Sequence, residues 1–247
     1  MTGAVCLQGG GEFSQGCREM DAELVRRYPG AVVVTALAGA PGREYATANR
    51  HGVEHYGALG AVEVRNAPDA REDPDGARRA LAGACVLVLP GGSPARLLEA
   101  LQTTPVGQRV REVLDEGGLV VGSSAGAMVV SAWTVLPDRT GMPVVRGLGL
   151  VPGVLVVPHW TGRRADWLRA AEAGTPRGTR VLGLPEESGL LVDGTTLTAL
   201  GQGPTRLVLE DRDLAVGDSE DLAALPPAAD DARPHDPRQP SEGDPAP

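Results

Sequence analysis

The sequence predicts a doubly wound α/β fold in which a mostly parallel β-sheet is flanked by helices. Short aliphatic runs alternate with helical segments through most of the 247 residues, which is the order that βαβ units produce. Aromatic residues make up only 3% of the chain while apolar residues make up 42%, so the core consists mainly of Val, Leu and Ala. Such a core is typical of a parallel sheet covered on both faces.

The first half of the chain repeats the strand and helix pattern in a regular way. Aliphatic or β-branched runs predict strands at 4–7, 31–36, 61–64, 85–89 and 118–121. Helices are predicted at 17–28, 42–59, from 75 to about 84, and at 94–101, 105–116 and 125–130. Pro94 and Pro105 fall near the start of their helices, where proline is tolerated. Met20, Leu24 and Tyr28 recur at four-residue spacing and indicate the buried side of the first helix.

Beyond residue 131 the elements become shorter. Strands are predicted at 133–136, 144–145, 154–157, 181–184, 190–192, 195–200 and 207–209, with a helix at 163–173. Asp193-Gly194 predicts a hairpin turn and an antiparallel finish. The segment 226–247 is rich in Pro, Asp and Ala and cannot bury enough apolar surface to offset its ordering entropy. The expected organisation is one domain, 1–225, and a disordered tail, 226–247.

Charge and hydropathy exclude several classes of function. A net charge of −9 argues against nonspecific binding to nucleic acid or to an anionic membrane. No apolar run approaches the roughly 20 residues of a membrane span, and no signal peptide is visible. Three cysteines are an odd count without metal-type spacing, which indicates a reducing, cytoplasmic environment. We expect Cys6 and Cys85 to be buried, whereas Cys17 follows the glycine-rich N-terminal loop, where it could be exposed.

A Gly-x-Ser-x-Gly motif at 122–126 marks the candidate nucleophile, Ser124. A predicted strand runs into it and a helix of small residues follows at once. This context holds the serine on a tight strand-to-helix turn, where Gly122 and Gly126 avoid side-chain clashes. The helix N-terminus places partial positive charge beside the hydroxyl, which favours an oxyanion. The pentapeptide alone is often only a tight turn, so the flanking strand and helix carry the prediction.

A serine nucleophile needs a general base, and His159 is the candidate. It comes directly after the aliphatic run 154–157 and therefore lies at the carboxyl end of a strand, where α/β folds place their sites. The alternative is a structural histidine packed against Trp160. An acid should orient the imidazole, and Glu186 and Asp138 both occupy loop positions that can face the site. A solvated carboxylate is the alternative for either acid.

The other histidines predict no metal site. His51 and His55 stand one helical turn apart in a polar helix, but no clear third ligand accompanies them, and we expect both on the surface. His235 falls in the predicted tail. The sequence therefore implies neither a metal nor an organic cofactor.

Two backbone amides are expected to bind the oxyanion. One is the N–H of Ala125, the residue after the nucleophile, and the other is that of Gly92 in the glycine-rich loop 90–93. This loop ends a strand that should lie beside the serine strand. A phosphate-binding loop is the rival interpretation, but no Gly-Lys-Ser/Thr follows, and the glycines at 9–11 lack the spacing of a dinucleotide fingerprint.

These residues in combination resemble the dipeptidase E and cyanophycinase family of serine peptidases, which have a class I glutamine amidotransferase-like fold. The resemblance covers about residues 80 to 200. It rests on Leu89-Pro90-Gly91-Gly92-Ser93, Gly122-Ser123-Ser124-Ala125-Gly126-Ala127, Gly147-Leu148-Gly149-Leu150, Pro158-His159-Trp160 and Gly183-Leu184-Pro185-Glu186. It implies a hydrolase in which Ser124 attacks a peptide or isopeptide bond, His159 carries the proton, and Gly92 and Ala125 hold the oxyanion.

The resemblance also bears on the acid of the triad. Dipeptidase E-like members place an aspartate near a Met-Pro pair after the serine helix. Met142-Pro143 is present here, but Gly141 stands where that aspartate would be. Cyanophycinase-like members have a glutamate at the position of Glu186. We therefore prefer Glu186 and keep Asp138 as the reserve.

Departures from the family pattern concern the substrate. Ser93 stands where the family usually has Asn, and Val157 stands where cyanophycinase-like sequences have Asp. Of their arginine series after the histidine, only Arg163 and Arg164 remain. We expect Ser93 and Arg163 to bind substrate, because an arginine can hold an aspartyl or terminal carboxylate with two hydrogen bonds. The alternative for both arginines is a solvated helix start.

The leading prediction is a cytoplasmic serine peptidase that cleaves small peptides, including Asp-containing dipeptides, through an acyl-enzyme on Ser124. One alternative is a glutamine amidotransferase-like amidase, although those enzymes use cysteine as the nucleophile. The other is an inactive relative that binds a metabolite. The expected partner is a small peptide, with no nucleic acid and no membrane, and both a monomer and a homodimer remain open.

Overall fold

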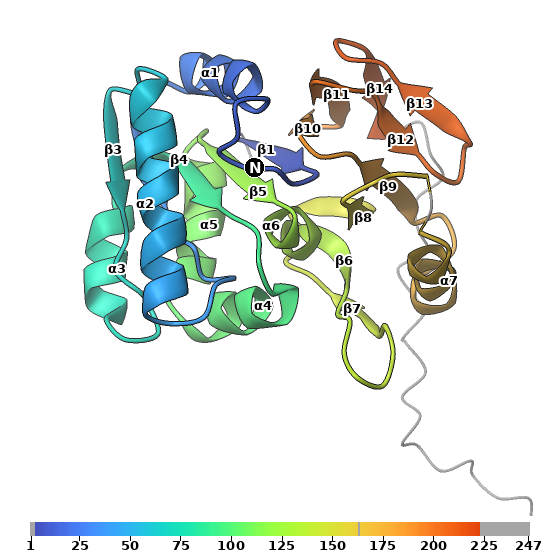
Figure 1. Ribbon diagram of the computed structural model, residues 1–247, viewed down its shortest axis with the longest axis horizontal. Helices are drawn as coiled ribbons and strands as arrows, with labels where there is room; N and C mark the ends of the chain where they lie inside the picture. The colour runs from blue at the N-terminus through green and yellow to red at the C-terminus, as the bar shows by residue number, and fades with distance from the viewer. Residues whose placement is uncertain (1–2, 163, 223–247) are drawn as a thin grey trace, which may run out of the picture.

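Two β-sheets organise the computed structural model, which describes residues 3–162 and 164–222 (Figure 1). The predicted tail, 226–247, and Arg163 lie outside the described residues. Within the described part, no helix has the length and apolarity needed to cross a bilayer.

The first sheet has eight strands in the order β14-β11-β10-β1-β5-β4-β2-β3. Their bounds are β1 Ala4–Gln8, β2 Ala31–Val34, β3 Glu63–Asn66, β4 Ala84–Leu89, β5 Leu119–Ser123, β10 Ser188–Asp193, β11 Thr196–Gly201 and β14 Ser219–Asp221. Five neighbouring strands, β1-β5-β4-β2-β3, pair in parallel. β10, β11 and β14 extend the sheet from β1 with antiparallel pairing. The predicted α/β class is confirmed, as is the hairpin at Asp193-Gly194 that joins β10 to β11.

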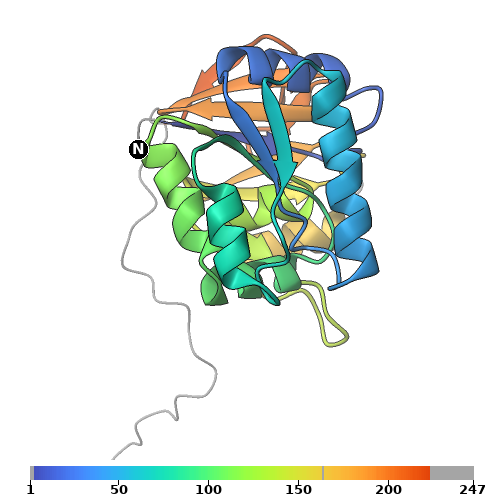
Figure 2. The ribbon, with the colours of Figure 1, turned by 90° about the vertical axis from the view of Figure 1, so that its left-hand side faces the viewer.

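Helices cover both faces of this sheet. They are α1 Arg18–Arg27, α2 Arg43–Ala58, α3 Pro74–Leu81, α4 Pro94–Thr103 and α5 Val106–Asp115. Leu24 of α1 and Tyr56 of α2 pack with Val32 and Val34 on one face. Val33 of the same strand points the other way and joins the core beneath α3, α4 and α5, as the alternation of a strand requires. Figure 2 looks onto the β3 edge and shows α2 and α3 on opposite sides of it.

The second sheet has six strands in the order β13-β12-β9-β8-β6-β7. Their bounds are β6 Ser131–Val135, β7 Val144–Arg146, β8 Val151–Pro158, β9 Arg180–Leu184, β12 Thr205–Leu207 and β13 Arg212–Leu214. β6, β8 and β9 pair in parallel, and the other three strands are antiparallel. The helix α7, Ala165–Gly174, lies beside β6 and β7 (Figure 1). The sequence pattern does not distinguish this sheet from the first, and it does not indicate the three-residue strands β13 and β14, which carry charged residues.

The short helix α6, Ala125–Val130, fills the space between the two sheets. All its residues are buried, and it contacts β5 of the first sheet and β6 and β8 of the second (Figure 1). Glycines permit this close approach. A Cβ on Gly122 would lie 2.6 Å from the carbonyl carbon of Gly126, and a Cβ on Gly126 would collide with the carbonyl oxygen of Leu89. The motif that presents the serine therefore also lets α6, which contacts both sheets, pack closely on the first.

All three cysteines carry free thiols. Cys6 is buried as expected, but Cys85 is only partly buried, and Cys17 is buried rather than exposed. The Cys17 thiol lies beneath the loop after β1, 3.2 Å from the carbonyl oxygen of Gly11. Burial, with a smaller contribution from the Asp21 carboxylate, raises the pKa of Cys17 to about 11. This thiol is therefore protonated and unreactive near neutral pH.

Replacing Gly122 with Ala should destabilise the fold, because the added methyl group forces α6 away from β5. We expect a loss of about 1–3 kcal/mol in the free energy of unfolding, measured by urea titration. Gly57→Ala is the matched control, since a Cβ there meets nothing within 4 Å and alanine favours a helix by up to about 1 kcal/mol. Equal stabilities for the two variants would contradict the packing role of Gly122.

Cys17 should resist alkylation in the native protein. A pKa of about 11 lowers the thiolate fraction at pH 8 so far that iodoacetamide should react about 100-fold more slowly than in the urea-unfolded protein. Mass spectrometry of the Cys17 peptide measures both rates, with the Cys85 peptide as an internal reference. Equal rates before and after unfolding would show that the thiol is accessible.

Candidate active site

Ser124 occupies a strained turn between β5 and α6. Its backbone has φ 49° and ψ −107°, and a positive φ in a non-glycine residue costs about 1–3 kcal/mol that the surrounding structure must supply. The turn is held because the Ser124 amide donates to the carbonyl oxygen of Gln8 at the end of β1, 2.9 Å away. The serine is 8% exposed. Buried elements on both sides therefore hold the hydroxyl in one place.

His159 extends from the end of β8 toward this hydroxyl. Its Nε2 lies 2.6 Å from Ser124 Oγ, a short hydrogen bond. Its backbone also has a positive φ, 124°, which turns the side chain away from the direction of the strand. Gly10 lies against the ring, where a Cβ would collide with the imidazole. Two residues from different sheets are thus in direct contact, each in an unfavourable backbone conformation.

Glu186 reaches the other side of the imidazole from the neighbouring strand. β8 and β9 are parallel, with Pro158 opposite Leu184, so the residues that follow the two strands are brought together. Glu186 Oε1 lies 3.2 Å from His159 Nδ1. The Glu186 side chain is 66% exposed and that of His159 is 37% exposed, so water competes with this pairing.

The loop 90–93 ends β4, which lies beside β5 as predicted. Two of its amides are engaged: Gly91 N–H donates to Glu12 Oε1 at 2.7 Å, and Ser93 N–H donates to the carbonyl oxygen of Ala38 at 2.9 Å. Within the described residues, no hydrogen bond is recorded for the Gly92 amide between them. Ala125 begins α6, where amides have no partner inside the helix. Among the described residues, neither of the two amides expected to bind an oxyanion is engaged by another acceptor.

Glu12 is the residue at this site that the sequence analysis missed. Its Oε1 accepts from Gly91, and its Oε2 accepts from the hydroxyl of Ser123 at 3.1 Å. The available signal was an acidic residue directly after the glycines at 9–11, at the end of a strand. The sequence alone does not show that Glu12 lies near Ser123 and Ser124. That proximity follows from the parallel pairing of β1 with β5.

The other predicted site residues have different surroundings. The Ser93 hydroxyl accepts from the Arg96 amide at 3.3 Å and so caps α4. Asp138 accepts hydrogen bonds from Thr140 and Gly141 in its own turn, and the bonds from Thr140 hold the pKa of its carboxyl below the usual value. No contact between Asp138 and His159 is recorded within the described residues. Arg163 lies outside them.

His55 is not a surface residue, so that expectation is wrong. It is 6% exposed, and its Nε2 lies 2.7 Å from Asp21 Oδ2. Gln8 donates to the other oxygen of Asp21 at 2.6 Å, which ties this buried pair to the end of β1. His51 is exposed as expected. No group of three metal-binding side chains occurs in the part of the chain that the structure describes.

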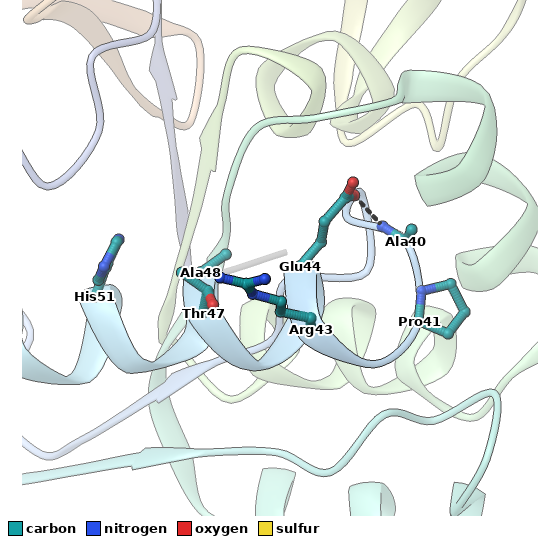
Figure 3. A pocket seen from close by; sticks show the side chains of 7 residues that line it. All are labelled: Ala40, Pro41, Arg43, Glu44, Thr47, Ala48 and His51. Atoms are coloured by element: carbon teal, nitrogen blue, oxygen red, sulfur yellow. Dashed lines mark hydrogen bonds between the residues drawn. The ribbon is translucent and has the colours of Figure 1, made fainter.

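Two hollows lie along α2. One of about 680 Å³ is lined by residues that include Arg43, Thr47 and His51, with Glu44 turned back to accept from the Ala40 amide at 2.7 Å (Figure 3). The other, of about 450 Å³, is lined by His51 and also by Glu12. Glu12, which also bonds to Gly91, is the residue that this second hollow shares with the surroundings of Ser124.

The arrangement has the parts needed for acyl transfer. A hydroxyl contacts an imidazole, the imidazole contacts a carboxylate, and the loop 90–93 packs against the serine through Gly91. Such a set can accept a proton from a serine, stabilise the charge of a tetrahedral intermediate and return the proton to a leaving group.

Comparison with known proteins places this geometry in a family. The family model described as peptidase family S51 matches residues 35–200. A cyanophycinase of Trichormus variabilis is 29% identical over 219 residues, which are 83% of this chain and 73% of the relative. A cyanophycinase of Synechococcus elongatus is 30% identical over 132 residues, which are 49% of this chain and 41% of that protein.

Solved structures show the same fold. The crystal structure of a peptidase from an acI-B1 actinobacterium superposes with a TM-score of 0.74 at 25% identity, covering 90% of this chain and 97% of that one. A peptidase E-like structure from Listeria monocytogenes has a TM-score of 0.60 at 16% identity, covering 82% and 100% respectively, and supports the fold alone. Because the family model matches more than half of the sequence, this chain belongs to peptidase family S51 and is a serine peptidase.

Proposed function

We propose that Ser124, His159 and Glu186 are the catalytic triad of this peptidase and that the amides of Gly92 and Ala125 form its oxyanion hole. The observation that carries the proposal is the 2.6 Å contact between Ser124 Oγ and His159 Nε2. The two residues are 35 positions apart and follow strands of different sheets. A purely structural hydrogen bond would not require the serine to adopt a strained backbone conformation, so the geometry favours a catalytic role.

The reaction follows from this geometry. His159 Nε2 takes the hydroxyl proton as Ser124 Oγ bonds to the carbonyl carbon of the substrate, and the carbonyl oxygen becomes an oxyanion facing the two amides. The imidazolium then gives its proton to the departing amine, which leaves an ester on Ser124. A water molecule, deprotonated by the same nitrogen, attacks this ester, releases the acid and restores the serine.

Glu186 is preferred to Asp138 as the acid of the triad. Its carboxylate is 3.2 Å from His159 Nδ1, where it holds the ring in the tautomer that leaves Nε2 free to accept a proton. The Asp138 carboxylate is engaged by Thr140 and Gly141. Because Glu186 is exposed, its contribution should be smaller than that of a buried acid.

We propose small peptides or isopeptides as substrates. Two arginines follow His159 in the sequence, and Arg164 is engaged by the His159 carbonyl oxygen at 3.1 Å and by the ring of Trp167. Arg163 is then the side chain proposed to bind a substrate carboxylate, with Ser93 contributing through its place in the loop beside Ser124. Val157 stands where cyanophycinase-like sequences have an aspartate, which argues against cyanophycin itself as the substrate. The three free thiols fit a reducing compartment such as the cytoplasm.

Ser124→Ala should abolish peptidase activity, because the variant has no nucleophile. We expect kcat/KM on a dipeptide panel to fall by about 10⁴-fold or more, and labelling by a serine-directed fluorophosphonate to disappear. Ser123→Ala, which changes the neighbouring hydroxyl, should keep the label. Wild-type activity in Ser124→Ala would refute the proposal, and an unlabelled wild-type protein would favour the inactive relative.

The acid can be identified by comparing Glu186→Gln with Asp138→Asn. Loss of the exposed carboxylate at 186 should lower kcat by about 10- to 100-fold, since water partly replaces it. Asp138→Asn should leave kcat within about twofold, as surface substitutions generally do. The measurement is steady-state hydrolysis of one peptide by both variants. The reverse ranking would assign the role to Asp138.

A further inference from the structure

We propose that Glu12 is a positioning residue that fixes the oxyanion-binding loop beside the nucleophile. One carboxylate joins two catalytic turns: Oε1 accepts from the Gly91 amide at 2.7 Å, and Oε2 accepts from the Ser123 hydroxyl at 3.1 Å. Gly91 precedes the proposed oxyanion donor Gly92, and Ser123 precedes the proposed nucleophile. The inference rests on the proposed roles of Ser124 and Gly92.

The contact is close enough to set the position of the loop. A Cβ on Gly91 would lie 2.7 Å from Glu12 Oε1 and 3.1 Å from the Cβ of Ser124, so the carboxylate, the loop and the nucleophile are packed against one another. The two oxygens of one side chain each accept a hydrogen bond, so the length of the side chain sets the distance between the loop and the turn before the nucleophile. Glu12 can therefore hold the loop in place beside Ser124.

The other end of the loop is held independently. The Ser93 amide donates to the carbonyl oxygen of Ala38, which also accepts from Arg96 Nη1 at 2.9 Å. Arg71 donates to the neighbouring carbonyl oxygens of Leu37 and Gly39. The segment 91–93 is thus fixed at Gly91 by Glu12 and at Ser93 by Ala38, and the Gly92 amide lies between the two attachments.

Glu12 is itself anchored by its neighbours in the chain. The carbonyl oxygen of Gly10 accepts from the Glu187 amide at 2.9 Å. Phe13 packs against the buried ring of His55, with ring centroids 5.6 Å apart, and against Tyr56 at 6.2 Å. The carboxylate is therefore presented from a fixed backbone. Oxyanion stabilisation depends on donors that are in place before charge develops, and Glu12 supplies that preorganisation for Gly92.

Two variants of Glu12 distinguish the effect of side-chain length from the effect of negative charge. Glu12→Gln keeps the length of the side chain: its carbonyl oxygen can accept from Gly91 and its amide can donate to Ser123 Oγ. Glu12→Asp keeps the charge but is one methylene shorter and cannot span both partners. Glu19→Ala, at an exposed acidic residue on α1, is the matched control. Each variant is assayed for kcat and KM on the same peptide, and circular dichroism and thermal unfolding check the fold.

We expect Glu12→Gln and the control to keep kcat within about threefold of wild type. We expect Glu12→Asp to lose about 10- to 100-fold in kcat with little change in KM, because a displacement of about 1 Å near the reacting atoms has an effect of this size. A kcat for Glu12→Asp equal to that of wild type would overturn the proposal. So would equal losses in both variants, or an effect confined to KM, which would indicate that the charge binds the amino group of the substrate.

These outcomes are distinct from failure of the proposed triad. If Ser124→Ala retains wild-type turnover in the same assay, the triad is wrong and the positioning role falls with it. If Ser124→Ala is inactive while Glu12→Asp is fully active, the triad stands and only the role of Glu12 is rejected.

Discussion

The hydrogen bond between Ser124 and His159 depends on how two β-sheets are held together. The serine ends a strand of the first sheet and the histidine ends a strand of the second, so a 2.6 Å contact requires a fixed junction between them. The helix α6 supplies it, with backbone packed on backbone at Gly122 and Gly126. Side chains at those glycines would push α6 away from β4 and β5 of the first sheet. The Gly-x-Ser-x-Gly motif is thus a packing motif as well.

Backbone strain is concentrated around this junction. Ser124, His159 and Glu187 are non-glycine residues with positive φ, and all three lie where one element gives way to the next. Strain of this kind persists only where the surroundings fix the chain on both sides. Here the aliphatic strands of both sheets fix the chain. The strained conformations direct the hydroxyl of Ser124 and the imidazole of His159 toward each other.

The sequence was sufficient for what depends on local pattern. Most strands and helices up to α6 follow from aliphatic runs, although the strand predicted at 61–64 is β3, Glu63–Asn66. Ser124 and His159 are candidates because of their places at strand ends. The existence of a second sheet cannot be predicted from local pattern. Its strands resemble those of the first sheet in sequence, and only the hydrogen-bonded pairing between strands distinguishes the two sheets. Glu12 and the buried pair of His55 with Asp21 also escaped, since each acquires its partner across elements far apart in the chain. The polar residues of α2 predict a face exposed to solvent. In the structure, α1 and the end of β1 cover the part of that face that carries His55.

The exposure of Glu186 has a consequence for the proposed triad. With two-thirds of the carboxylate side chain facing solvent, the resting enzyme shares its acid with water, and the pair it forms with the imidazole is weakened by that hydration. A bound peptide that displaces the water strengthens the same pair, since attraction between charges grows as the local dielectric falls. If the proposed triad holds, substrates that exclude water from Glu186 should therefore be turned over faster than substrates that leave it hydrated.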